Sequence, residues 1–182
     1  DYVIVGNIAL VDEAGEYYYD TSANTLTIFP FSGVNPNNVG NIFEVAARDI
    51  GLSFPKGANA PHDIVVQGIE VKHAAKAGVW LDGSGVSATQ AARDLEFDNL
   101  YIHHNAGNGF MVEWYSRVAN ITLMNSRIEW NGQYGVFWSG HNTDSPYFSA
   151  NSTIRDNIVS ENLITGISVN DVADVIIQGN TV

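Results

Sequence analysis

The sequence predicts an all-β chain folded as a right-handed parallel β-helix, a solenoid with three short strands in each coil. A gapless pattern of 19 residues recurs four times, beginning at Asp63, Asp94, Asn120 and Asn151. Each copy carries three short segments in which apolar residues alternate, as in strands with one buried face. Glycine and asparagine recur in fixed columns of the aligned copies. A β-sandwich also has short strands, but it does not predict such a register, and right-handed crossovers are the rule for parallel strands.

The chain is expected to form a single domain, residues 1–182, in three parts. Residues 1–9 read as a partial coil, residues 10–62 as an insertion and residues 63–182 as regular coils. Within the insertion, "EYYYD" and "TLTIFPF" around "TSAN" predict a β-hairpin, and "NIFEV" and "IGLSF" predict strands that rejoin the solenoid. Because both ends of the sequence fall inside a coil, we expect a longer parent chain.

Five columns of the aligned repeat predict which residues are buried and which form the turns between strands. Three apolar columns are expected to point into the core: Val66, Phe97, Leu123, Ile154; Val71, Ile102, Ile128, Val159; and Val79, Phe110, Val136, Ile167. A glycine column (Gly78, Gly109, Gly135, Gly166) marks a place that needs positive φ or leaves no room for a Cβ. An asparagine column (Asn105, Asn131, Asn162) is expected to hydrogen-bond from coil to coil, with Ala74 as the exception.

Composition excludes several classes of function. The net charge of -12 disfavours nucleic acid and anionic membrane surfaces as partners. The absence of cysteine excludes disulfides and thiolate chemistry. No apolar run approaches the ~20 residues of a membrane span.

The second strand of the repeat gathers most of the candidate catalytic residues. Outward residues of one column lie ~4.8 Å apart from coil to coil, so two neighbouring columns form one patch. The columns are Lys72, His103, Glu129, Ser160 and Glu70, Tyr101, Arg127, Ile158. A lyase or epimerase acting on a uronic acid needs a cation for the carboxylate (Arg127 or Lys72), a base for the C5 proton (His103) and an acid for the leaving oxygen (Tyr101). Alternating charges on a solvated sheet face would give the same pattern. His104 belongs to the next column, where a structural turn is expected.

A second candidate lies on the first strand of the second copy. Asp94, Glu96 and Asp98 alternate outward in "RDLEFDN". Residues two apart on a strand lie ~6.6 Å from each other, near the carboxylate separation of an inverting glycosidase. The three carboxylates would also suit Ca²⁺, although a solvated acidic strand explains them equally, and no residues are assigned as metal ligands.

Aromatic residues in the connections after the third strand suggest a substrate-binding wall. Trp114 and Tyr115 fall in one expected loop, and His141 and Tyr147 in the next. Sugar rings stack on such side chains. Packing of the loops onto the coils is the alternative interpretation.

Three segments together resemble a known superfamily. "GEYYYD", the following "TLTIFP" and repeats such as "NITLMNSRIEWNGQYGV" resemble secreted bacterial right-handed β-helix proteins of the pectate-lyase-like superfamily. The resemblance implies the β-helix fold, an extracellular location and a polysaccharide or oligosaccharide partner. It does not imply one reaction, since the superfamily includes lyases, hydrolases, epimerases and non-catalytic members.

Two classes of function follow. The first is an extracellular carbohydrate-active protein that acts on an acidic polysaccharide by lyase or epimerase chemistry, with a glycoside hydrolase using paired carboxylates as the alternative. The second is a non-catalytic structural or adhesive module that stacks end to end through its open strand edges.

Overall fold

The computed structural model describes residues 8–14, 16–20, 22–30, 35, 47–140 and 151–182, which group into two compact units, Asp1–Glu44 and Val45–Val182. The first unit contains a short 3-10 helix, η1 (Ile8–Leu10), and an antiparallel hairpin of β1 (Tyr17–Asp20) and β2 (Thr25–Ile28). The pairing of β1 with β2 confirms the predicted hairpin. Most of the predicted partial coil at residues 1–9, and the "NIFEV" segment, lie outside the described residues.

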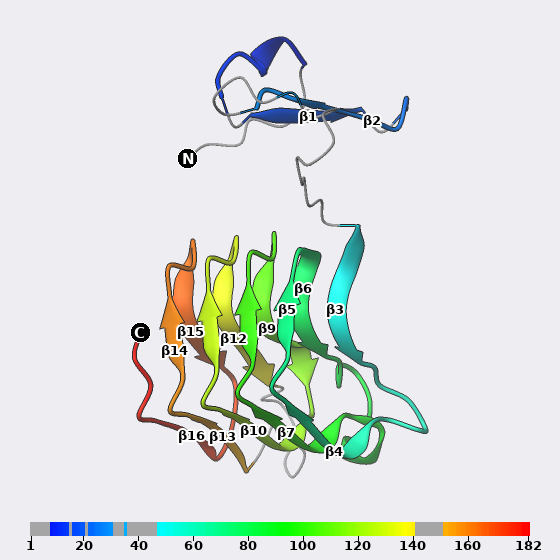
Figure 1. The fold of residues 1–182 in the computed structure, drawn as a ribbon. Coiled ribbons are helices and arrows are strands. Elements are labelled where there is room, and N and C mark those ends of the chain that lie inside the picture. Colours follow the sequence, from blue (N-terminus) through cyan, green and yellow to red (C-terminus); the bar gives the residue numbers. More distant parts are fainter. Residues whose placement is uncertain (1–7, 15, 21, 31–34, 36–46, 141–150) are drawn as a thin grey trace. The chain divides into compact units, whose positions relative to one another are not determined.

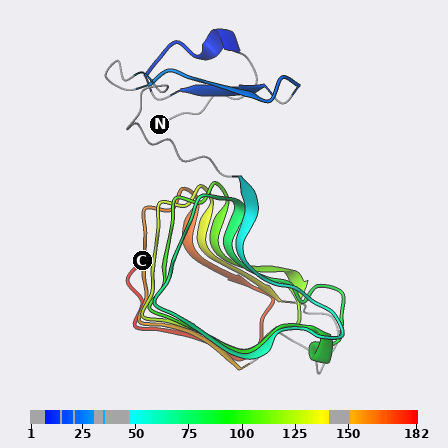
Figure 2. The same ribbon diagram turned by 45° about the vertical axis from the view of Figure 1, so that its right-hand side comes forward.

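The second unit is a parallel β-helix built from three sheets (Figures 1 and 2). The first sheet contains β4 (His62–Gln67), β7 (Arg93–Asp98), β10 (Ala119–Met124), β13 (Ser152–Arg155) and β16 (Val175–Gln178). The second sheet contains β5 (Glu70–Lys72), β8 (Tyr101–His103), β11 (Arg127–Glu129) and β14 (Ile158–Ser160). The third sheet contains β3 (Arg48–Phe54), β6 (Ala74–Leu81), β9 (Asn108–Ser116), β12 (Tyr134–Gly140) and β15 (Thr165–Asn170). A 3-10 helix, η3 (Ala88–Gln90), lies in the connection between β6 and β7.

All three predicted apolar columns are confirmed by the strand register. Phe97 pairs with Val66 on one side and Leu123 on the other, and the equivalent columns through Ile102 and Phe110 are paired in the same way. These side chains form one buried core that extends from coil to coil. At its centre, the rings of Phe54, Phe97 and Phe110 pack edge to face at 5.1 and 5.0 Å.

The asparagine column forms the predicted ladder between the second and third sheets. Asn105 Oδ1 accepts a hydrogen bond from the Ala74 backbone N–H (2.9 Å), and Asn105 Nδ2 donates to Asn131 Oδ1 (2.9 Å). Asn131 Nδ2 continues to Asn162 Oδ1 (2.9 Å). The ladder satisfies turn amides that are buried between coils.

The glycine column is explained by close packing. A Cβ on Gly109 would lie 2.6 Å from Ile128 Cγ2, 2.7 Å from the Gly135 carbonyl oxygen and 2.8 Å from Asn131 Nδ2. Most of the left-handed backbone conformations fall instead on three other columns, one at each corner region. They are Asp63, Asp94, Asn120, Asn151, Asp174; Gly68, Asn99, Asn125, Asp156, Gly179; and His73, His104, Trp130, Glu161. Asn, Asp and Gly tolerate this conformation best, which explains the composition of the first two columns.

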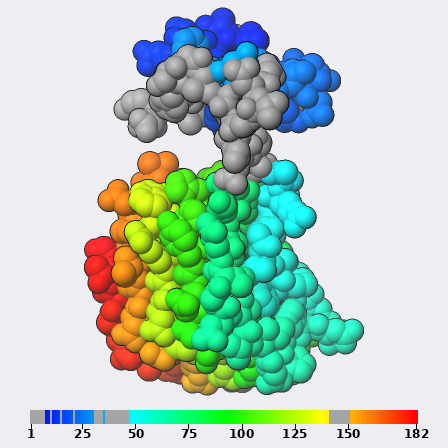
Figure 3. All heavy atoms as spheres, in the orientation of Figure 1, coloured from blue at the N-terminus to red at the C-terminus, as the bar shows by residue number. Residues whose placement is uncertain are grey.

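The solenoid includes β3, so it begins before the first regular copy of the repeat. Strand β3 pairs in parallel with β6, as expected for "IGLSF" rejoining the coils. Figure 3 shows the packed outer surface of the coils. No described helix is both long and apolar enough to cross a membrane.

Candidate functional site

The second sheet places the predicted cluster on one outer face, because its three-residue strands point their middle residues inward. Val71, Ile102, Ile128 and Val159 fill the core. The flanking residues therefore face outward in the register predicted from the repeat. They pair as Glu70–Tyr101–Arg127–Ile158 and Lys72–His103–Glu129–Ser160.

Glu129 lies at the centre of this cluster and is 1% exposed. It accepts hydrogen bonds from the Tyr101 hydroxyl (2.8 Å) and from Arg127 Nε (2.6 Å). The Arg127 side chain remains 57% exposed, and its Nη atoms make no hydrogen bond to a described residue. Arg127 therefore presents N–H donors to solvent while Glu129 fixes its orientation.

His103 is positioned beneath Tyr101 and is only 7% exposed. The two rings stack with their centroids 3.8 Å apart. His103 Nε2 lies 2.8 Å from Glu70 Oε1, and its Nδ1 lies 2.6 Å from His104 Nδ1. Since both ring nitrogens already have partners, His103 is placed to orient Tyr101 and Glu70 and not to contact a bound sugar.

The electrostatics of the cluster follow from these contacts. The hydrogen bond from His103 and the nearby charge of Lys72 hold the pKa of Glu70 below its usual value. Burial and the hydrogen bond to Glu129 raise the pKa of the Tyr101 hydroxyl. The hydrogen bond to Glu129 also raises the pKa of Arg127. At neutral pH, Glu70 is therefore ionised, Tyr101 is protonated and Arg127 is cationic.

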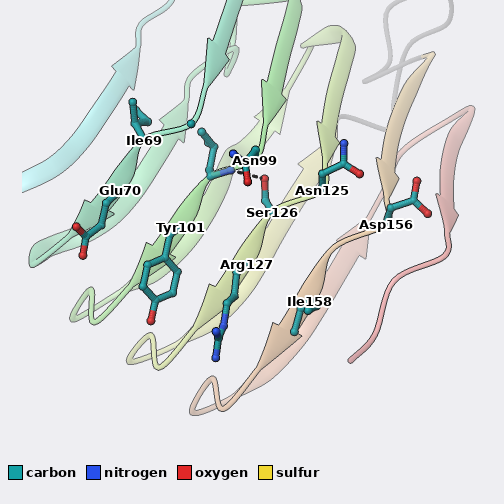
Figure 4. Close-up of a pocket in the computed structure, with 11 residues that line it drawn as sticks. Ile69, Glu70, Asn99, Tyr101, Asn125, Ser126, Arg127, Asp156 and Ile158 are labelled. Atoms are coloured by element: carbon teal, nitrogen blue, oxygen red, sulfur yellow. Dashed lines mark hydrogen bonds between the residues drawn. The ribbon is translucent and has the colours of Figure 1, made fainter.

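A groove of about 500 Å³ runs beside this cluster, across four strands of the second sheet (Figure 4). Glu70, Tyr101, Arg127 and Ile158 line one side of it. The turns that precede these strands line the other side with Gly68, Ile69, Asn99, Leu100, Asn125, Ser126 and Asp156. The groove crosses the coils, so a linear chain lying in it would contact equivalent positions of successive repeats.

The comparisons with known proteins agree with this architecture. The family model described as "right handed beta helix region" matches residues 56–182. The chain belongs to the right-handed β-helix family. No curated protein and no solved structure matches it.

The carboxylates on β7 of this β-helix protein face outward, as predicted, but two of them have structural partners. Asp94 adopts a left-handed backbone conformation and accepts a hydrogen bond from Asn120 Nδ2 (2.7 Å). Asp98 accepts from Gln67 Nε2 (2.6 Å) and Asn125 Nδ2 (2.8 Å). These hydrogen bonds link Asp94 and Asp98 to the neighbouring coils of the first sheet.

The Ca²⁺ alternative gains no support from the side-chain positions. Within the described parts of the chain, no group of three or more histidine or acidic side chains is arranged to hold a metal ion.

The predicted aromatic wall is placed differently by the structure. Trp114 and Tyr115 lie in β9, because this strand extends to Ser116, whereas the sequence placed them in a loop. Both side chains are exposed, and Trp114 packs against Phe137 of the third sheet, with ring centroids 4.8 Å apart. They therefore lie on a strand of the third sheet, away from the residues that line the groove. The predicted residues His141 and Tyr147 lie outside the described residues.

The groove contains polar residues that the sequence analysis did not single out. Asn99, Asn125 and Asp156 occupy one left-handed turn position in successive coils. Their signal was present in the aligned copies, where Gly68 precedes them in the same column. His104 was expected at a turn, and its φ of 51° confirms this.

Proposed function

We propose that this right-handed β-helix protein is an extracellular carbohydrate-active protein that binds an acidic polysaccharide in the groove and acts on it by lyase or epimerase chemistry. The observation that carries the proposal is Arg127, an exposed guanidinium at the groove whose orientation is fixed by a buried carboxylate. A guanidinium held in this way is suited to a substrate carboxylate. The extracellular location rests on the superfamily resemblance.

The dimensions of the groove suit a chain of sugars. Strands in a sheet lie ~4.8 Å apart, close to the length of one sugar unit in an extended polysaccharide. The groove crosses β5, β8, β11 and β14, so successive sugars would lie beside successive strands. The exposed Asn99 and Asn125 amides on the opposite side could bind sugar hydroxyls.

The reaction we propose uses Tyr101, Glu129 and Arg127. Arg127 binds the uronate carboxylate and stabilises the charge that develops on it. The Tyr101 oxygen removes the C5 proton while its own proton passes to Glu129, which it already contacts at 2.8 Å. In a lyase, the C5 electron pair then forms the C4–C5 double bond, the C4–O bond breaks, and the proton returns through Tyr101 to the leaving oxygen. In an epimerase, the C4–O bond stays intact and C5 instead takes a proton from solvent on its opposite face, while the proton held by Tyr101 and Glu129 is released to solvent.

His103 takes a positioning role in this scheme. Its ring supports Tyr101 by stacking and holds Glu70 by a hydrogen bond. We therefore propose Tyr101 for proton removal, in place of the base assigned to His103 from the sequence. Lys72, which lies 3.7 Å from Glu70, contributes to the charge of the cluster and is not needed for the reaction.

The test combines a binding titration with product analysis. The protein is incubated with polygalacturonate, alginate, hyaluronan and gellan, and both ultraviolet-absorbing unsaturated uronides and new reducing ends are recorded. Arg127→Ala should lose binding and activity. Tyr101→Phe should keep binding and lose unsaturated products. Arg93→Ala is the matched control. It also removes one positive charge, but Arg93 is paired with Asp94 and does not line the groove, so this variant should keep both binding and activity.

Each result separates the candidate functions. Reducing ends without unsaturated products would favour the hydrolase alternative and its β7 carboxylates. Binding without any product, with C5 configuration unchanged by NMR, would leave a non-catalytic carbohydrate-binding module. Failure of the wild-type protein to bind any acidic polysaccharide would overturn the proposal.

A further inference from the structure

The charges around the groove are unequally distributed. Arg127 is the one cationic side chain among the described residues that line it. Glu70 lies on the strand two positions away, and Asp156 lies on the turn that leads into β14 (Figure 4). The groove therefore has a positive centre with a carboxylate on either side.

The flanking carboxylates have partners, but these partners do not line the groove. Lys72 Nζ lies 3.7 Å from Glu70 Oε1, and Arg155 Nη1 lies 2.9 Å from Asp156 Oδ2. The Glu70 side chain is still 51% exposed, and that of Asp156 is 50% exposed. Pairing at the surface weakens a negative charge without reversing it, so neither flank attracts a second anion.

The remaining positions along the groove are uncharged. Tyr101 lies between Glu70 and Arg127, and Ile158, which is 50% exposed, follows Arg127 on the next strand. A tyrosine ring and an isoleucine side chain suit the apolar faces of neutral sugars. With about one sugar for each strand spacing of ~4.8 Å, only the sugar beside Arg127 meets a cation.

From this pattern we propose that the groove selects a heteropolysaccharide in which a single acidic sugar is separated from the next by several neutral sugars, and that it discriminates against homopolymers of uronic acid. This inference rests on the proposed function and specifies its substrate class. A homopolyuronate would place a carboxylate beside Arg127 and also beside Glu70 and Asp156. Like charges brought together in this way lower affinity.

The experiment compares two polysaccharides at low ionic strength, where surface charges act most strongly. Gellan carries one glucuronate per repeat, separated by neutral sugars, whereas polygalacturonate carries a carboxylate on every sugar. Titration calorimetry with oligosaccharides of matched length should show tighter binding of the gellan fragment by about tenfold, the ratio for 1.4 kcal/mol of discrimination. Glu70→Gln keeps the shape of the side chain and should raise the affinity for oligogalacturonate relative to that for the gellan fragment by several-fold.

A matched control removes the same charge elsewhere. Asp49→Asn alters an exposed carboxylate on β3 that does not line the groove, and it should change neither affinity. Tighter binding of oligogalacturonate than of gellan fragments, or no effect of Glu70→Gln on their ratio, would overturn the selectivity and leave the proposed function intact. No binding of either fragment would overturn the selectivity, and no binding of alginate and hyaluronan as well would overturn the proposed function.

Discussion

The asparagine ladder gives the sharpest stability prediction, through the substitution Asn131→Ala. Asn131 is 1% exposed. Its Oδ1 accepts hydrogen bonds from the backbone N–H (3.2 Å) and Nδ2 (2.9 Å) of Asn105. Its Nδ2 donates to Asn162 Oδ1 (2.9 Å) and to the carbonyl oxygens of Glu129 (3.2 Å) and Ile102 (3.4 Å). Alanine removes all five of these side-chain contacts and leaves buried partners without a hydrogen bond.

The expected loss follows from the number of contacts. A hydrogen bond contributes about 1 kcal/mol net, and leaving a buried group unsatisfied costs about 1–3 kcal/mol. The loss of these five contacts, of which the 3.4 Å one to Ile102 is the weakest, therefore predicts a decrease of about 3–5 kcal/mol in the free energy of unfolding. A domain stable by about 5–15 kcal/mol can lose this much and still fold, although with less reserve.

Urea unfolding followed by tryptophan fluorescence measures the effect, with comparison at equal m-value. Asn170→Ala is the control, because the Asn170 side chain is exposed and donates a single hydrogen bond among the described residues, to Ser168 Oγ at 3.2 Å. It should cost less than about 0.5 kcal/mol. A loss below about 1 kcal/mol for Asn131→Ala would refute the claim that the ladder stabilises the coils.

Three further outcomes are expected. Gly109→Ala should destabilise by about 1–3 kcal/mol or more, because its Cβ would lie within 2.8 Å of three atoms; a neutral effect in urea unfolding would contradict the close packing of coils. Burial is the largest cause that lowers the pKa of His104 below 6.5, and the charges of His103 and His73 add to it. The unfolded chain therefore binds more protons than the folded one, so the free energy of unfolding should fall as the pH decreases through 6.5. His104→Asn, which suits the left-handed φ of 51°, should reduce that pH dependence, and an unchanged slope would refute it. Glu129→Gln should weaken the orientation of Arg127 and lower polysaccharide affinity several-fold, and unchanged affinity would argue against this role.

The β-helix itself could be predicted because its signal is repeated in every coil. Each aligned copy contributes one residue to each core column. A departure from the pattern at one position, such as Ala74 in the asparagine column, therefore does not change the alignment of the copies. Once the register is known, the neighbours of Tyr101 follow directly, since strand pairing fixes them. This is why the sequence brought Tyr101, His103, Arg127 and Glu129 together correctly.

The roles of individual side chains were harder to predict, because they depend on rotamers and burial. Alternation placed Glu129 and His103 on the outer face, yet both side chains are covered by their neighbours. The extent of β9 was also missed, since "EWYS" contains no glycine or proline that distinguishes a loop from a strand. The groove residues Asn99 and Asn125 were overlooked, because the candidate site was sought among the outward residues of the second strand and not in the turn that precedes it.

The central claim is that an acidic saccharide binds across the outer face of the second sheet, and NMR titration tests it most directly. Amide and side-chain shifts of the ¹⁵N-labelled protein are followed during addition of a gellan oligosaccharide. The largest changes are expected at Tyr101, Arg127 and the turn residue Asn125. Changes confined to β7 or to Trp114 and Tyr115 on β9 would contradict it.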